Sequence, residues 1–198
     1  MNRRKKMSNM SNLRAEMRRA QREEYKLQKN KGKDAELMRA QKRGFENGKV
    51  ISAATTILAL HTELGWDADK INSFAWSVAG QLRNSNAFVV DFAATVWRDK
   101  LEKRIEERAT APIKMFVRSA IQSVEYRNRN VAYLNCCAFM FTNLYSNFNL
   151  SSNNKGTGKL DKVIEKCVQC WYDFMQNPDY YSNEKCKART KEITGVCL

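Results

Sequence analysis

Hydrophobic positions recur with the period of an α-helix along nearly the whole chain. Stripes spaced three or four residues apart run over Ile71–Leu82, Ile113–Val124 and Leu160–Phe174. Val50–Leu60 and Val131–Phe148 are apolar almost all round, which is typical of helices buried on every side. No stretch of useful length alternates with the period of a strand. We therefore expect an all-α bundle of about seven or eight helices.

Glycine and polar runs predict where these helices end. Gly65 is expected to cap the C-terminus of one helix, and Asp67 to cap the N-terminus of the next. We also expect Gly32 to break an earlier helix and the polar run Tyr126–Asn130 to break a later one. Asn149–Gly158, rich in Asn, Ser and Gly, is predicted to be a flexible loop and a sub-boundary within the bundle.

Two further patterns concern packing. Gly44, Gly48 and Ser52 step by four, so another helix can approach this face closely. A helix that starts at Ser85 or Asn86 is expected to end in a solvated charged run. The residues expected to be buried by that helix are Phe88, Phe92, Val96 and Leu101.

Charged residues are distributed unevenly along the chain. The 198 residues carry a net charge of +14, and 43% of them are hydrophobic, enough for a core. Residues 1–50 hold 16 Lys and Arg against 6 Asp and Glu, whereas residues 51–198 carry only +4. We therefore expect a basic helical arm over residues 1–33 and a helical bundle domain over residues 34–198, with an anionic partner.

The predicted arm has two interpretations. Met10, Leu13, Met17, Ala20 and Leu27 form a weak heptad seam, which would serve a homo-oligomer. The basic residues form either a solvated face or a surface that tracks nucleic-acid phosphates. The candidate nucleic-acid-binding residues are Arg3, Arg4, Lys5, Lys6, Arg14, Arg18, Arg19, Arg22, Lys26 and Lys29.

Neither export nor membrane insertion is expected. The basic start is followed by no apolar segment of the kind found in signal peptides. Val131–Asn154 has no charged residue and is long enough to span a bilayer, but its several amides would be costly in lipid, so a core helix is preferred. The six cysteines are then expected to be reduced thiols in a cytoplasm.

Lys155–Lys159, Lys-Gly-Thr-Gly-Lys, has only part of a phosphate-binding loop. Asn153 stands where the first glycine of the motif is needed, and Leu160 stands where a hydroxyl would hold Mg²⁺. No strand precedes the segment. We expect a loop here and no nucleotide hydrolysis.

The other candidate chemistry is equally incomplete. Cys167 and Cys170 could give two thiolates to zinc, but they lie on an amphipathic helix, where cysteine behaves as a small hydrophobe. His61 has no nucleophile or orienting acid near it in sequence, so a hydrogen-bonded histidine in the core or at a helix end is expected. Leu60–Leu82 has the spacing of a helix-turn-helix unit, but Asp67 and Asp69 would face phosphates, and an ordinary corner fits better. We expect no metal, no cofactor and no enzymatic activity.

Gly44-Phe-Glu-Asn-Gly48, the segment Leu-His61-Thr-Glu-Leu-Gly65 and the helix after it resemble small helical accessory proteins encoded by phages and mobile elements. The likeness covers residues 44–83. Such proteins often carry a basic–aromatic pair after the glycine, and Trp66-Asp67 departs from that pattern. The resemblance implies a phage accessory protein and supplies no catalytic residues.

Together these features lead to one hypothesis and one alternative. The hypothesis is a non-enzymatic phage-type protein in the host cytoplasm that binds nucleic acid or a host nucleoprotein complex. One form of it is an anti-CRISPR type inhibitor of an RNA-guided defence nuclease, which needs no active site. The alternative is a structural or oligomeric interaction module that binds no nucleic acid.

Overall fold

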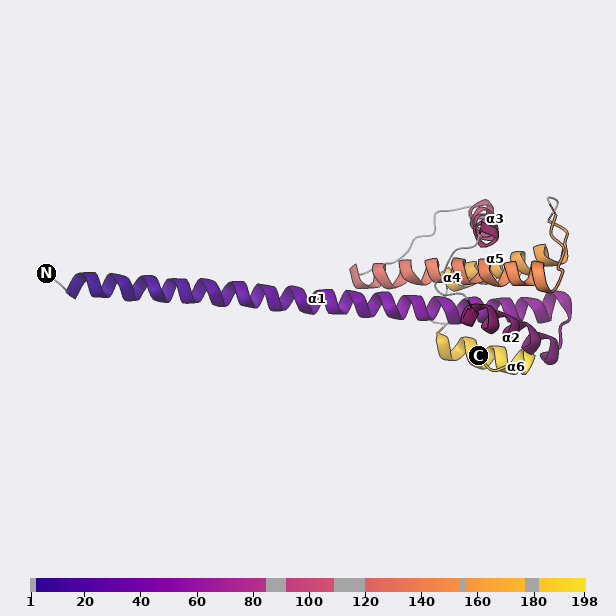
Figure 1. The fold of residues 1–198 in the computed structure, drawn as a ribbon, viewed down its shortest axis with the longest axis horizontal. Coiled ribbons are helices and arrows are strands. Elements are labelled where there is room, and N and C mark those ends of the chain that lie inside the picture. The colour runs from indigo at the N-terminus through magenta and orange to yellow at the C-terminus, as the bar shows by residue number, and fades with distance from the viewer. Residues whose placement is uncertain (1–2, 85–91, 109–119, 154–155, 177–181) are drawn as a thin grey trace. The chain divides into compact units, whose positions relative to one another are not determined.

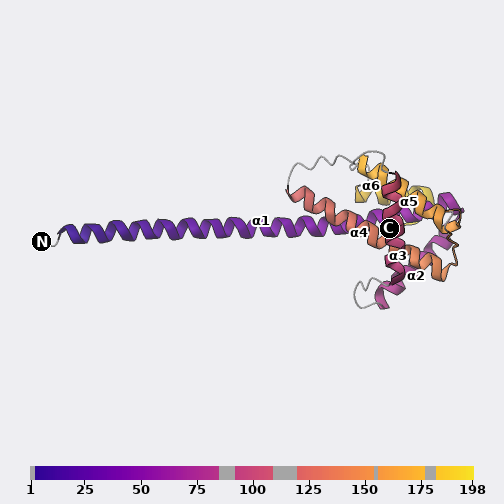
Figure 2. The same cartoon turned by 90° about the horizontal axis from the view of Figure 1, so that it is seen from above.

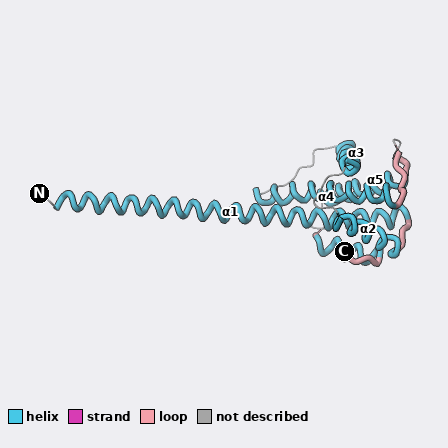
Figure 3. The backbone as a smooth tube through the Cα atoms, in the orientation of Figure 1, coloured by secondary structure: helices cyan, strands magenta, loops and turns pink. Residues whose placement is uncertain are grey.

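The protein is all-α, as the sequence predicts. The computed structural model describes the backbone of residues 3–84, 92–108, 120–153, 156–176 and 182–198, and side chains within 32–80, 94–108, 121–153, 156–173 and 182–198. Throughout these ranges there are helices, turns and loops but no strand (Figure 3). The six helices are α1 (Arg3–Leu64), α2 (Ala68–Asn84), α3 (Phe92–Arg108), α4 (Ala120–Asn147), α5 (Lys159–Gln176) and α6 (Asn183–Thr194) (Figure 1).

The chain separates into two compact units, Met1–Ala40 and Gln41–Leu198. The first unit is helical from Arg3 onward. The second contains the end of α1 and the five other helices. The charge distribution predicts a boundary between the arm and the bundle at residues 33 and 34, and this boundary stays a prediction.

Two predicted breaks are wrong. α1 continues through Gly32, because one glycine costs a helix only about 1 kcal/mol and its neighbours are good helix formers. α4 continues through Tyr126–Asn130, where Glu125 pairs with Arg43 at 3.1 Å and with Arg129 at 3.6 Å. A polar run can stay helical where its residues lie on the surface of a helix that packs on its other side. The start of the helix expected from the stripe Ile113–Val124 falls on residues 109–119, outside the described part, so the count of seven or eight is not confirmed.

α4 packs closely against Gly44 and Gly48 of α1, as the four-residue spacing of these small residues predicts. A Cβ at Gly44 would lie 2.1 Å from the carbonyl oxygen of Glu125. A Cβ at Gly48 would lie 2.3 Å from the carbonyl oxygen of Arg129 and 2.7 Å from Cβ of Ala132. Both positions would place a Cβ too close to the backbone of α4, so this register of α1 against α4 requires glycine at both.

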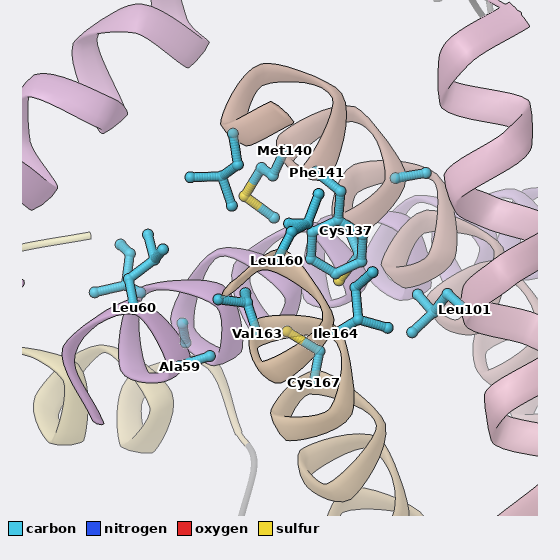
Figure 4. Packing of buried hydrophobic residues seen from close by; sticks show 14 of the residues in the cluster. Ala59, Leu60, Leu101, Cys137, Met140, Phe141, Leu160, Val163, Ile164 and Cys167 are labelled. Carbon is cyan, nitrogen blue, oxygen red and sulfur yellow. The ribbon is translucent and has the colours of Figure 1, made fainter. Parts of the chain in front are cut away.

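The core of the second unit takes side chains from all six described helices, and α1, α3, α4 and α5 supply most of them. Figure 4 shows side chains from these helices converging, among them Leu60, Leu101, Phe141 and Ile164. These four are at most 1% exposed. α3 runs across α4 at a steep angle, as Figures 1 and 2 agree. The predicted inward residues of α5 are buried wherever their side chains are described, namely Leu160, Val163, Ile164, Cys167 and Trp171.

One predicted core residue of α3 is wrong. Val96 is 48% exposed, whereas Trp97, Leu101 and Ile105 are buried. Those three are four residues apart and define the inner face, and Val96 lies one residue, about 100°, away from it. The prediction for Leu101 is confirmed, while the side chains of Phe88 and Phe92 lie outside the described residues.

The corner between α1 and α2 forms as predicted. Gly65 has φ +65°, its N–H donates to the carbonyl of His61 at 3.0 Å, and the N–H of Trp66 donates to that of Leu60 at 3.3 Å. The hydrogen bond from Gly65, a left-handed residue, back to His61 is that of an αL C-cap. Asp67 Oδ1 then accepts from the N–H of Lys70 at 2.9 Å, which caps α2.

Candidate functional site

The candidate nucleic-acid-binding residues all lie in the first unit. Their backbone belongs to α1 from Arg3 onward, and the side chains of residues 1–31 lie outside the described part. An unbroken helix turns about 40° beyond one full turn for every four residues, so positions 14, 18, 22 and 26 form one slowly winding stripe. The first unit holds 13 Lys and Arg against 5 Asp and Glu. Which atoms these cations contact stays a prediction.

The loop before α5 is organised by one buried carboxylate. Asp161 is 4% exposed and accepts from Nζ of Lys100 at 2.5 Å and from Oγ of Ser152 at 2.8 Å. It also accepts from the N–H groups of Asn153 at 2.9 Å and Gly158 at 3.0 Å. Burial alone would raise the pKa of Asp161, but these hydrogen bonds outweigh it and hold the pKa below its ordinary value.

This arrangement bears on the partial phosphate-loop motif. Two amides that could cradle a phosphate at the start of α5 are already bonded to Asp161. The N–H groups of Gly156 and Thr157 donate to Asn153. The described part of the loop is therefore held by its own hydrogen bonds, whereas the sequence predicts a flexible segment.

The cysteines of α4 and α5 lie in the core. Cys137 and Cys167 are fully buried and near each other, and burial raises the pKa of Cys137 and, to about 12, that of Cys170. Tyr133 lies in the same cluster and donates to the carbonyl of Cys167 at 2.9 Å. Among the described residues no three His, Cys, Asp or Glu side chains are grouped to hold a metal ion. Neutral buried thiols of this kind pack as hydrophobes and react slowly.

His61 stabilises the corner between α1 and α2. Its Nδ1 lies 2.9 Å from the carbonyl oxygen of Trp66, and since a carbonyl only accepts, Nδ1 is the donor. The expectation of a hydrogen-bonded histidine at a helix end is confirmed. Neighbouring Trp66 packs in the core against Phe74 and Phe148, with Nζ of Lys70 4.6 Å from the centroid of its ring.

Two hollows open on the second unit. The first has a volume of about 560 Å³ and lies between α3, α5, the loop at Gly156 and the end of α1. The second, about 510 Å³, lies beside the α1–α2 corner and shares Glu63 and Lys162 with the first. Its other charged lining residues are Asp67, Lys70 and Lys159.

Four basic side chains line the first hollow, which was not predicted from the sequence. Arg104 and Arg108 are four apart on α3, and Lys162 and Lys166 are four apart on α5. Each pair could have been read from the sequence as one helix face. The register that brings the two faces together could not, because it depends on how α3 crosses the other helices.

None of the helices within the described ranges combines the length and the apolar composition needed to cross a membrane. Comparisons with protein-family models, curated proteins and solved structures found no match to this chain. The likeness of residues 44–83 to phage accessory proteins therefore stays a prediction.

Proposed function

We propose that the protein is a non-enzymatic nucleic-acid-binding protein that holds phosphates along the N-terminal part of α1. The observation that carries the proposal is that Met1–Ala40 forms a unit of its own, helical from Arg3, with a net charge of +8. A basic helix of this kind attracts a polyanion, and each bound phosphate releases counterions.

Phosphate binding without base reading is the expected mode. The stripe at positions 14, 18, 22 and 26 consists of arginine and lysine, and Gln21 and Gln28 stand apart from it. Bidentate amide contacts to adenine need Asn or Gln aligned with the groove. Contacts to phosphates position a protein on a duplex and carry no sequence information. We therefore expect binding with little sequence preference.

The narrower form of the proposal is a phage-type accessory protein that acts on a host nucleoprotein complex, an RNA-guided defence nuclease being one target. Such a protein works by occupying a nucleic-acid channel and needs no active site. The open alternative is an interaction module that assembles through the seam at Met10–Leu27. It would show a concentration-dependent mass by sedimentation and no affinity for nucleic acid.

The experiment compares two variants of the full chain on two duplexes of unrelated sequence. One variant combines Arg14→Ala, Arg18→Ala, Arg22→Ala and Lys26→Ala. Its control removes the same charge from exposed lysines of the second unit, through Lys42→Ala, Lys103→Ala, Lys187→Ala and Lys191→Ala.

The first variant is expected to bind both duplexes at least about tenfold more weakly, because up to four phosphates are no longer neutralised by the protein. The control should retain most of the affinity. Equal weakening in the two variants would mean that only net charge matters, and would overturn the assignment to α1.

A further inference from the structure

We propose that the hollow between α3, α5 and the Gly156 loop is a phosphate-binding pocket whose cations are Arg104, Lys162 and Lys166. This goes beyond the proposed function, since the pocket lies within residues 41–198 and none of the ten candidate residues of α1 lines it. Its ligand is a phosphate group carried either by a small molecule or by a nucleic-acid backbone.

The charges of the lining residues leave the pocket positive. Glu165 is paired with Arg108, which also donates to Gln169, and Asp161 is satisfied by Lys100 and the loop. Within the described part of the chain, Arg104, Lys162 and Lys166 form no ion pair. Of the carboxylates that line the pocket, Glu63 alone forms no ion pair with a described residue. Three cations thus face one unpaired acid in the hollow.

Gly156 lies next to Arg104 at the wall of the pocket. A Cβ at this position would lie 2.5 Å from Nη2 of Arg104, so the guanidinium packs closely against the backbone of the loop. The loop takes φ +71° here, which glycine adopts without strain. Arg104 is half-buried, and a guanidinium presents its donors in one plane that suits the oxygens of a phosphate.

The walls indicate what the ligand is. All the lining residues are charged or polar apart from Gly156, and none is aromatic or aliphatic. A nucleobase would find no ring to stack on, and an apolar ligand would find no surface to cover. A volume of about 560 Å³ has ample room for a diphosphate group. Recognition is therefore of the phosphates alone.

The test titrates the ¹⁵N-labelled full chain with inorganic pyrophosphate at constant ionic strength, with chloride as the reference anion. The signals followed are the backbone amides of Gly156 and Thr157 and the side-chain Nε of Arg104. We expect saturable shifts of these three signals. Shifts no larger than those caused by chloride would overturn the proposal.

Variants assign the binding to the pocket. The triple variant Arg104→Gln, Lys162→Gln and Lys166→Gln should bind pyrophosphate at least about tenfold more weakly, since it cannot form the charge-assisted hydrogen bonds. The control Lys42→Gln, Lys187→Gln and Lys191→Gln removes the same charge from exposed positions elsewhere. It should bind like the unchanged protein, and equal weakening in both would contradict the proposal. Lys162→Gln alone, at an exposed position, keeps the test valid if the triple variant fails to fold.

A short single-stranded oligonucleotide then identifies the source of the phosphate. If it shifts the same three signals and competes with pyrophosphate, the pocket holds a nucleic-acid backbone. If it shifts only other signals, the ligand is a small phosphate compound. Either result upholds the pocket. The pocket and the α1 proposal fail separately, because each variant leaves the other's cations unchanged.

Discussion

Nζ of Lys100 on α3 lies 2.5 Å from Oδ1 of Asp161 in the first turn of α5. The same carboxylate accepts hydrogen bonds from the N–H groups of Asn153 and Gly158 and from the hydroxyl of Ser152. One buried acid therefore joins α3, the loop and α5. It fixes the loop that carries Gly156 and the proposed phosphate pocket.

Asp161→Asn is expected to lower the free energy of unfolding by about 2–3 kcal/mol, because it leaves the half-buried ammonium of Lys100 without its carboxylate partner and turns one acceptor into a donor. Urea unfolding followed by circular dichroism measures the change. Glu165→Gln is the control, since its carboxylate is exposed on the same helix. A destabilisation at Asp161 no greater than the one at Glu165 would contradict the role given to the buried acid.

The same residue predicts a pH dependence. The pKa of Asp161 is lowered in the folded protein, so its stabilisation is complete above the ordinary aspartate pKa of about 3.9 and disappears as the pH falls through the folded value. The difference in unfolding free energy between the unchanged protein and Asp161→Asn should be constant from neutral pH to about pH 5 and should shrink below about pH 4. Urea titrations over this range measure it. A difference that persists in acid would show that the carboxylate charge is not its source.

Alanine substitutions at two helical glycines, Gly48 and Gly80, serve as a test and its control. Gly48→Ala should destabilise the protein by about 2 kcal/mol or more, since the new Cβ meets the backbone of Arg129 and must push α4 away. Gly80→Ala in α2 meets nothing within 4 Å and should stabilise by about 0.5–1 kcal/mol through helix propensity. Thermal melting of both variants is the measurement. Similar effects of the two changes would mean that α1 and α4 do not pack as closely as described.

Much of the fold follows from local pattern, and the errors share a physical cause. The Gly65 cap, the Asp67 cap and the inward face of α5 depend on residues close in sequence, and all were predicted. The break expected at Tyr126–Asn130 is absent, and the backbone of α4 at Glu125 and Arg129 packs against Gly44 and Gly48 of α1, which are far away in sequence. Val96 was expected in the core because helical spacing alone does not say which face of α3 meets α4.

For the candidate sites too, features set by residues close in sequence could be predicted, and features that depend on distant contacts could not. Charge distribution along the chain was enough to single out the N-terminal cations. The pocket at Arg104 and Lys162 was missed, because it exists only where α3, α5 and the Gly156 loop meet. Asp161 was missed as well, since its partner Lys100 is 61 residues away in sequence.

Residues 34–198 are expected to fold without the N-terminal stretch. Every residue of the buried hydrophobic cluster belongs to Gln41–Leu198, so removing residues 1–33 takes nothing from it. The truncated chain should melt cooperatively, with a helical circular dichroism spectrum. Absence of the cooperative transition would mean that the first 33 residues contribute to the core.

The central claim, that α1 binds nucleic-acid phosphates, is tested most directly by the salt dependence of duplex binding. The logarithm of the affinity should fall linearly with the logarithm of the salt concentration. The variant with Arg14, Arg18, Arg22 and Lys26 changed to alanine should have a slope shallower by about 0.9 for each phosphate that the protein no longer neutralises. Alanine favours helix, so circular dichroism should show that α1 is retained. An unchanged slope and affinity in that variant would contradict the claim and leave the basic stripe a solvated helix face or an oligomer seam.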